Sequence, residues 1–172
     1  MLAYKDKYTN VVLQEYPWNS NPKIGWWRDN RELTLYHGTH IDNLLNIART
    51  GLWAPSVGPT ANWVSLALEP NTASGYASMS GGETNFRQAG SRARNVPQNE
   101  RVVLVYKFPI NYVLSNMNQH LRGNIDWTKN KLLNESEYRE WKKTDQEYYM
   151  MTEIRMPKVV ESKYLKGYMR KN

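Results

Sequence analysis

The order of the hydrophobic segments constrains the fold of this chain more than any other feature. Five strands are expected, over residues 33–38, 63–68, 101–110, 148–156 and 164–169. Three helices are expected, over residues 39–51, 71–77 and 134–144. Strand and helix alternate only at the start, and strands dominate afterwards. The sequence therefore indicates an α+β fold rather than regular βαβ alternation.

The first helix has the clearest end signals. Thr39 can cap it, with Asp42 three positions later in a capping-box relation. Apolar residues then recur at helical spacing, and Gly51 stands where a glycine that follows a helix belongs.

The length of 172 residues fits one domain without an internal linker. Residues 1–32 are rich in aromatic residues and Asn and have little periodicity, so we expect an irregular N-terminal arm with one or two short elements. Residues 33–172 are expected to form a single domain. Residues 79–100 are polar and rich in breakers, and they make a longer connection than ordinary structure needs.

Several classes of protein are excluded by composition. The chain has no Cys, so it has no disulfide framework, no thiolate zinc site and no cysteine nucleophile. It lacks the apolar run of a signal peptide, and no stretch approaches the ~20 apolar residues that cross a bilayer. We expect a soluble, cytoplasmic protein without membrane association. What stands out is a formal charge of +7, which favours association with anions.

Tyr36-His37-Gly38-Thr39 is the first place suited to chemistry. A His at the end of a strand, followed by Gly, leaves backbone N–H and C=O groups open to a flat polar ligand. The imidazole can donate one hydrogen bond outward while the protein holds its other nitrogen. The tetrapeptide is also compatible with a His that caps the next helix or packs under the sheet.

Two more places become informative beside the first. Ser65 on a strand precedes Tyr76 on the next helix, so a hydroxyl could bind a ligand on which the ring stacks. Glu153 is a carboxylate inside an otherwise apolar strand, which is costly unless the carboxylate is paired or used. Taken alone, each is better explained by ordinary structure: a solvated Ser with a core Tyr, and an edge strand with alternate residues in water.

The three places together resemble the ADP-ribosyltransferase superfamily of the histidine–tyrosine–glutamate type. The shared pattern is a strand with His-Gly-Thr before a helix, then a strand with Ser before a helix with Tyr, and finally a late strand with Glu. Residues 35–52 are similar to the opening of DarT-type DNA-targeting toxins and of rifampin-modifying ADP-ribosyltransferases. Residues 153–160 with Tyr164-Leu165 resemble the family's catalytic-Glu strand and the strand after it. The resemblance spans residues 33 to about 168. It implies two small mixed or antiparallel sheets that form a split NAD-binding cleft with flanking helices.

The resemblance implies roles for the matched residues. His37 would touch the ribose of NAD, and Gly38 with Thr39 would offer the backbone that grips the nicotinamide amide. The ring of Tyr76 would stack on nicotinamide, and Glu153 would be the catalytic carboxylate, with His37 and Tyr76 as the other members of the catalytic set. NAD would be a co-substrate, and no metal is expected.

Two positions bear on the subgroup. Ser65 stands where this type often carries Tyr and where the arginine-directed type carries Ser, so it is placed at NAD with its role left open. Arginine-directed members have a second Glu two residues before the catalytic one, and Met151 stands there. An arginine acceptor is therefore disfavoured.

The charge bears on the acceptor. Beyond residue 154 the basic residues outnumber Glu161, and they are Arg155, Lys158, Lys163, Lys166, Arg170 and Lys171. Arg92 and Arg94 add charge in the polar loop, and with Arg155 they are expected to contact the acceptor. Cations interleaved with aromatic residues are typical of single-stranded nucleic-acid binding. A solvated basic surface, or one matched to an acidic protein, is the alternative.

The expected function is mono-ADP-ribosyl transfer. The protein would cleave NAD at the nicotinamide–ribose bond and transfer ADP-ribose to DNA or RNA, as a toxin, phage or defence effector. An antitoxin or immunity protein would then be a partner. The alternatives are transfer to a protein side chain other than Arg, and a non-catalytic module that binds NAD or nucleic acid.

Overall fold

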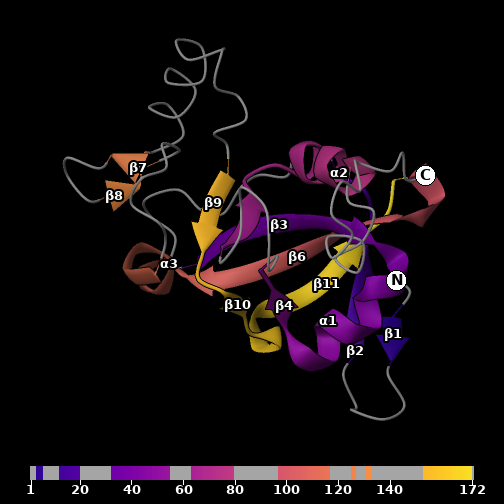
Figure 1. Cartoon of the computed structure of the whole chain (residues 1–172), viewed down its shortest axis with the longest axis horizontal. Helices are drawn as coiled ribbons and strands as arrows, with labels where there is room; N and C mark the ends of the chain where they lie inside the picture. Colours follow the sequence, from indigo (N-terminus) through magenta and orange to yellow (C-terminus); the bar gives the residue numbers. More distant parts are fainter. Residues whose placement is uncertain are drawn as a thin grey trace, which may run out of the picture.

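The computed structural model of the chain describes residues 3–5, 12–19, 32–54, 63–79, 97–116, 125–126, 131–132 and 153–171. Its strands (Figure 1) are β1 (Ala3–Lys5), β2 (Val12–Tyr16), β3 (Glu32–His40), β4 (Leu52–Trp53), β5 (Val64–Ala67), β6 (Arg101–Pro109), β7 (Ile125–Asp126), β8 (Lys131–Leu132), β9 (Glu153–Met156), β10 (Val159–Val160) and β11 (Leu165–Met169). Its α-helices are α1 (Leu44–Thr50), α2 (Pro70–Met79) and α3 (Ile110–Asn116), and 3₁₀ turns lie at Ile41–Asn43, Gln98–Glu100 and Ser162–Tyr164. None of the described helices is long and apolar enough to cross a membrane.

Seven of the described strands form one mixed sheet, in the order β1-β2-β11-β6-β3-β5-β9. β2 and β11 are parallel, and every other neighbouring pair in this sheet is antiparallel. Two separate two-stranded ladders join β4 to β10 and β7 to β8. A largely antiparallel sheet with a few short helices confirms the predicted α+β class.

The joint between β3 and β5 divides the large sheet into two parts. β3 pairs with β6 along all nine of its residues, and β5 pairs with β9 along all four of its residues. Between β3 and β5 a single pair, Tyr36 and Ala67, is in register. We call this joint the β3–β5 seam. The resemblance implied two small sheets with a cleft between them, whereas seven of the described strands form one sheet whose two parts are joined by one pair at the seam.

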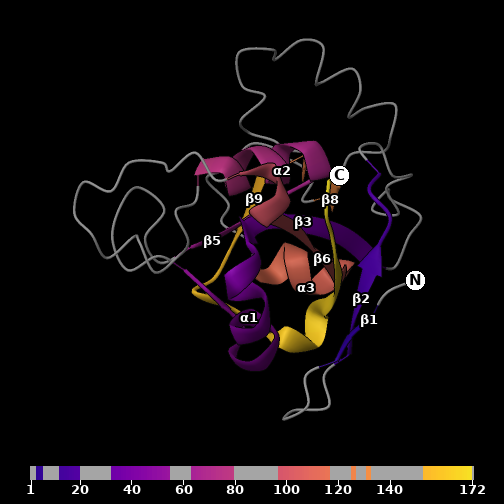
Figure 2. The ribbon, with the colours of Figure 1, turned by 90° about the vertical axis from the view of Figure 1, so that its right-hand side faces the viewer.

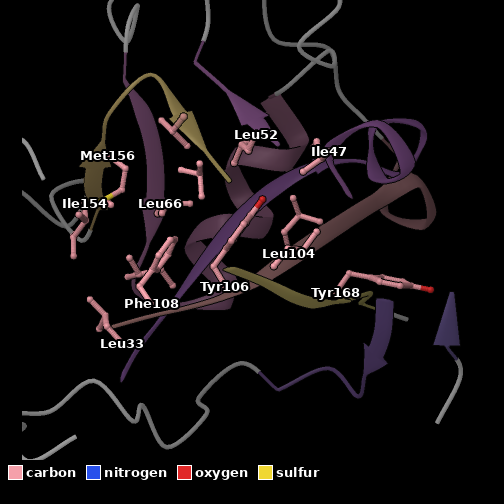
Figure 3. Close-up of a cluster of buried hydrophobic side chains, with 14 of the residues drawn as sticks. Leu33, Ile47, Leu52, Leu66, Leu104, Tyr106, Phe108, Ile154, Met156 and Tyr168 are labelled. Atoms are coloured by element: carbon pink, nitrogen blue, oxygen red, sulfur yellow. The ribbon is translucent and has the colours of Figure 1, made fainter. Parts of the chain in front are cut away.

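The sheet buries side chains on both faces, with α1 and α2 on opposite sides (Figure 2). The larger cluster lies on the α1 side (Figure 3) and includes Leu33, Leu35, Ile47 and Leu104. The smaller cluster lies on the α2 side and includes Tyr36, Ala67 and Ala73. Because neighbouring residues of a strand alternate between faces, His37 occupies a position on the α1 side.

The first helix starts later than the capping signal predicted. β3 continues through His40, so Thr39 is a strand residue, and its buried hydroxyl accepts a hydrogen bond from Asn43 Nδ2 at 3.1 Å. His40 caps the 3₁₀ turn Ile41–Asn43 that leads into α1, because its Nδ1 accepts the backbone N–H of Asp42 at 3.1 Å. The prediction that Thr39 caps the helix was therefore wrong. The predicted end is confirmed, since Gly51 follows α1 with a φ of 90°.

The other predicted elements have mixed outcomes. β3, β5, β6 and β11 confirm four predicted strands, and β9 is the described part of the fifth. α2 confirms the second helix and begins at Pro70, a residue whose fixed φ suits the first helical position. The sequence did not predict α3. Residues 80–96 and the predicted helix at 134–144 lie outside the described residues.

The N-terminal arm contributes strands to the sheet. β2 pairs in parallel with β11, and Leu13 is buried in the larger cluster. The two strands approach closely at Gly167, where a Cβ atom would collide with the carbonyl oxygen of Gln14 and with a ring carbon of Tyr16. A residue without a side chain at this position therefore permits the pairing.

Candidate functional site

His37 lies at the β3–β5 seam and bridges it. Its Nδ1 is 2.9 Å from the carbonyl oxygen of Ser65. Since a carbonyl only accepts, Nδ1 is the donor of this hydrogen bond. In a continued antiparallel ladder Gly38 would lie opposite Ser65, but the register ends at Tyr36 and Ala67. Where the backbone pairing stops, the imidazole thus makes the hydrogen bond between the two strands.

Ser65 brings a second polar group to the seam. Its neighbours Val64 and Leu66 are buried in the larger cluster, so Ser65 alternates to the face that α2 covers. Its Oγ atom is buried and has no hydrogen-bond partner in the described part of the chain. Leaving a buried hydroxyl unsatisfied costs about 1–3 kcal/mol. A ligand atom that bonded this hydroxyl would remove that cost.

Glu153 stands two strands from His37 by backbone register. Ala67 pairs with Tyr36 on one side and with Glu153 on the other, so three strands contribute one residue each to a row across the sheet. Two interstrand spacings separate β3 from β9, about 10 Å. The side chain of Glu153 lies outside the described part of the structure.

Tyr76 belongs to α2, the helix that packs on β3 and covers the face with Tyr36 and Ala67. Its backbone lies three residues beyond the buried Ala73, on the helix beside the seam. The side chain of Tyr76 also lies outside the described part. Burial raises the pKa of Tyr36 on this face to about 12, so its hydroxyl stays neutral.

Gly38 and Thr39 lie in β3, beyond the pair that joins the seam. Gly38 is opposite Val103 and has ordinary backbone geometry, since Gly51 is the described glycine with positive φ. Thr39 is 1% exposed and its hydroxyl is bonded to Asn43. Of these two residues, the backbone is the part that a ligand at the seam could contact.

Of the three predicted acceptor cations, the structure describes Arg155. Arg155 is half-buried on β9, directly opposite Ser65 in the ladder. Arg92 and Arg94 lie outside the described residues.

The C-terminal cations are partly paired. Lys163 lies 3.5 Å from Glu161, and Arg170 Nε lies 3.1 Å from a carboxylate oxygen of Glu15 in β2. Glu15 is far away in sequence, so the predicted excess of charge in this segment is lowered by a residue of the arm.

His40 is a neighbour of the site that the sequence did not single out. Its Nε2 donates to Glu100 at 3.0 Å, because Nδ1 already accepts the N–H of Asp42. The carboxylate of Asp42, 3.5 Å from Nδ1, therefore receives no hydrogen bond from this neutral ring. The bond to Glu100 ties the end of β3 to a turn sixty residues later, which no local pattern could reveal.

The structure thus places three of the predicted residues on adjacent strands. The His37 ring contacts the backbone of Ser65, and the backbone of Glu153 lies one strand beyond that of Ser65.

No family model matches the chain, and a search of curated proteins finds no significant match.

Proposed function

We propose that the protein is an NAD-dependent mono-ADP-ribosyltransferase that binds NAD at the β3–β5 seam. The observation that carries the proposal is the joint itself: one pair holds it, His37 bridges it through Ser65, and Glu153 stands in register beyond it. These residues are far apart in sequence. They are also the ones for which the resemblance to ADP-ribosyltransferases implies contact with NAD or catalysis.

The residues at the seam fit the chemistry of NAD. The ligand offers a planar amide and ribose hydroxyls, and on the α2 face the seam offers backbone beyond the last pair and the buried Ser65 hydroxyl. His37 stands on the α1 face and holds the joint through the Ser65 carbonyl oxygen. The Ser65 hydroxyl has no hydrogen-bond partner among the described residues. A bound polar ligand would supply the missing bond.

In the proposed reaction, the bond between the ribose C1′ and the nicotinamide nitrogen breaks, and its electron pair leaves with neutral nicotinamide. Positive charge develops on C1′ and the ring oxygen, as in glycoside cleavage. The Glu153 carboxylate accepts a hydrogen bond from the ribose 2′-hydroxyl, and this bond strengthens as the charge grows. An acceptor oxygen or nitrogen then bonds to C1′, and its proton passes to Glu153 or to solvent.

Replacing Glu153 tests the proposal. We expect Glu153→Gln to lower the rate of nicotinamide release from NAD by about 10²–10³-fold, because the amide cannot supply the charge that favours the transition state. NAD affinity and thermal melting should change little. The measurements are chromatography of released nicotinamide and calorimetric titration with NAD.

Glu161→Gln is the matched control, since Glu161 is exposed and paired with Lys163. We expect this variant to keep the wild-type rate. Equal rates for Glu153→Gln and the wild type would refute the catalytic assignment. NAD binding without any nicotinamide release in the wild type would favour a non-catalytic binding module.

The proposed acceptor is a nucleic acid, supported by the +7 charge of the chain. Incubation with labelled NAD and a cell lysate, followed by digestion, identifies the acceptor class. Label that is released by nuclease and resists protease supports DNA or RNA. Label that is released only by protease would show transfer to a protein side chain instead.

A further inference from the structure

Trp53 is exposed in a way that core packing does not explain. With 52% of its surface open to solvent, it is the large hydrophobic residue that stands out among those described. It ends β4, where its neighbour Leu52 is buried in the larger cluster. Its indole N–H donates to the carbonyl oxygen of Thr50 at 3.0 Å, at the end of α1. The ring is therefore held at the surface by its polar edge, so little ordering remains to be done on binding.

Two exposed cations lie near Trp53 along the backbone. Arg49 lies in the last turn of α1, four residues before Trp53. Lys158 lies beside Ala54, the residue after Trp53, because its carbonyl oxygen accepts the N–H of Ala54 at 2.8 Å and Val159 lies directly opposite Trp53. We call Arg49, Trp53 and Lys158 the β4–β10 platform.

We infer that the β4–β10 platform binds an unpaired base of single-stranded nucleic acid, which stacks on Trp53 while Arg49 and Lys158 contact the flanking phosphates. A flat, fixed aromatic ring matches the π-face that every base presents. Cations close to the ring match the phosphates that flank a stacked base. An acidic protein would use the same cations, but its carboxylates would gain little from the exposed ring.

The platform is connected to the candidate site by β9. Figure 1 shows β9 leading from its start at Glu153 into β10, which lies beside β4 and α1. Six residues separate Glu153 from Val159, so their Cα atoms are at most about 20 Å apart. A stacked strand spans that distance in about six nucleotides. This inference rests on the proposed function: the platform holds the nucleic-acid strand whose acceptor group reaches the β3–β5 seam.

The platform is tested by the binding of labelled 12-nucleotide single strands, which fluorescence anisotropy measures. One strand carries bases of mixed sequence, and the other is abasic and keeps only sugars and phosphates. We expect Trp53→Ala to weaken binding of the base-containing strand about tenfold and to leave the abasic strand unaffected, because only bases stack. Lys158→Ala should weaken binding of both strands alike.

Two controls keep the test independent of folding. Trp53→Phe retains an aromatic ring and should keep most of the affinity, even if Trp53→Ala melts at a lower temperature. Lys107→Ala removes an exposed lysine from β6, away from the platform in the chain, and should leave the preference for bases unchanged.

The results separate this inference from the proposed function. If Trp53→Ala changes the affinity for neither oligonucleotide, or lowers both affinities equally, the platform does not stack a base and the inference is wrong. If polyglutamate binds as tightly as the strand and also depends on Trp53, the occupant is an acidic protein and the inference is likewise wrong. Nicotinamide release is measured without any strand, so a rate that is insensitive to Glu153→Gln would remove the proposed function while the binding result stands.

Discussion

Ser65 brings one bonded and one unsatisfied polar group to the seam. Its carbonyl oxygen is bonded to His37, while its buried hydroxyl has no partner in the described part of the chain. We expect Ser65→Ala to leave the free energy of unfolding unchanged or to raise it by about 1 kcal/mol, because the unsatisfied hydroxyl is lost. NAD should bind several-fold more weakly. Urea unfolding and calorimetric titration measure the two effects.

Ser162→Ala is a suitable control, since this half-buried serine lies in the turn before β11 and outside the seam. It should leave NAD affinity at the wild-type value. A clear loss of stability in Ser65→Ala together with unchanged NAD affinity would mean that the hydroxyl serves the fold and not a ligand.

At the level of elements, the joint between β2 and β11 depends on Gly167. We expect Gly167→Ala to lower the free energy of unfolding by about 1–3 kcal/mol, because the added Cβ overlaps the backbone of Gln14 and the ring of Tyr16. Amide exchange should become faster in β2 before it changes in β3 and β6, since β2 has only β1 and β11 as neighbours in the described sheet.

Gly75→Ala provides the matched control within α2. A Cβ atom there meets nothing within 4 Å, so alanine should stabilise the helix by roughly 0.5–1 kcal/mol. Equal stability of Gly167→Ala and the wild type would show that β2 can move away from β11 without cost.

For the whole molecule, the +7 charge predicts how the binding of single-stranded nucleic acid responds to salt concentration. A plot of log affinity against log salt concentration should fall with a slope of about −0.7 for each phosphate that the protein neutralises. We expect Lys158→Ala to reduce the magnitude of this slope by about 0.7, because one phosphate contact is lost. Anisotropy titrations at several salt concentrations measure it, and a flat wild-type plot would argue against a nucleic-acid acceptor.

The whole chain also shows which parts of the fold can be predicted from the sequence alone. Strands and the end of α1 follow local rules, and four of the predicted strands and the position of Gly51 are confirmed. The capping role passed from Thr39 to His40 because β3 gains pairing with β6 through His40, and this tertiary pairing extends the strand past its local stop signal. α3 was missed because its short apolar pattern directly follows the strand that precedes it.

The sequence by itself determined the α+β class, the main strands and the residue types suited to NAD chemistry, because periodicity and turn chemistry act over a few residues. Only the tertiary structure decided that His37 holds Ser65, that β9 lies beyond β5, and that Glu15 neutralises Arg170. It also left Trp53 exposed at the end of β4. These are contacts between residues far apart in the chain, which arise when strands choose their neighbours and which no local pattern encodes.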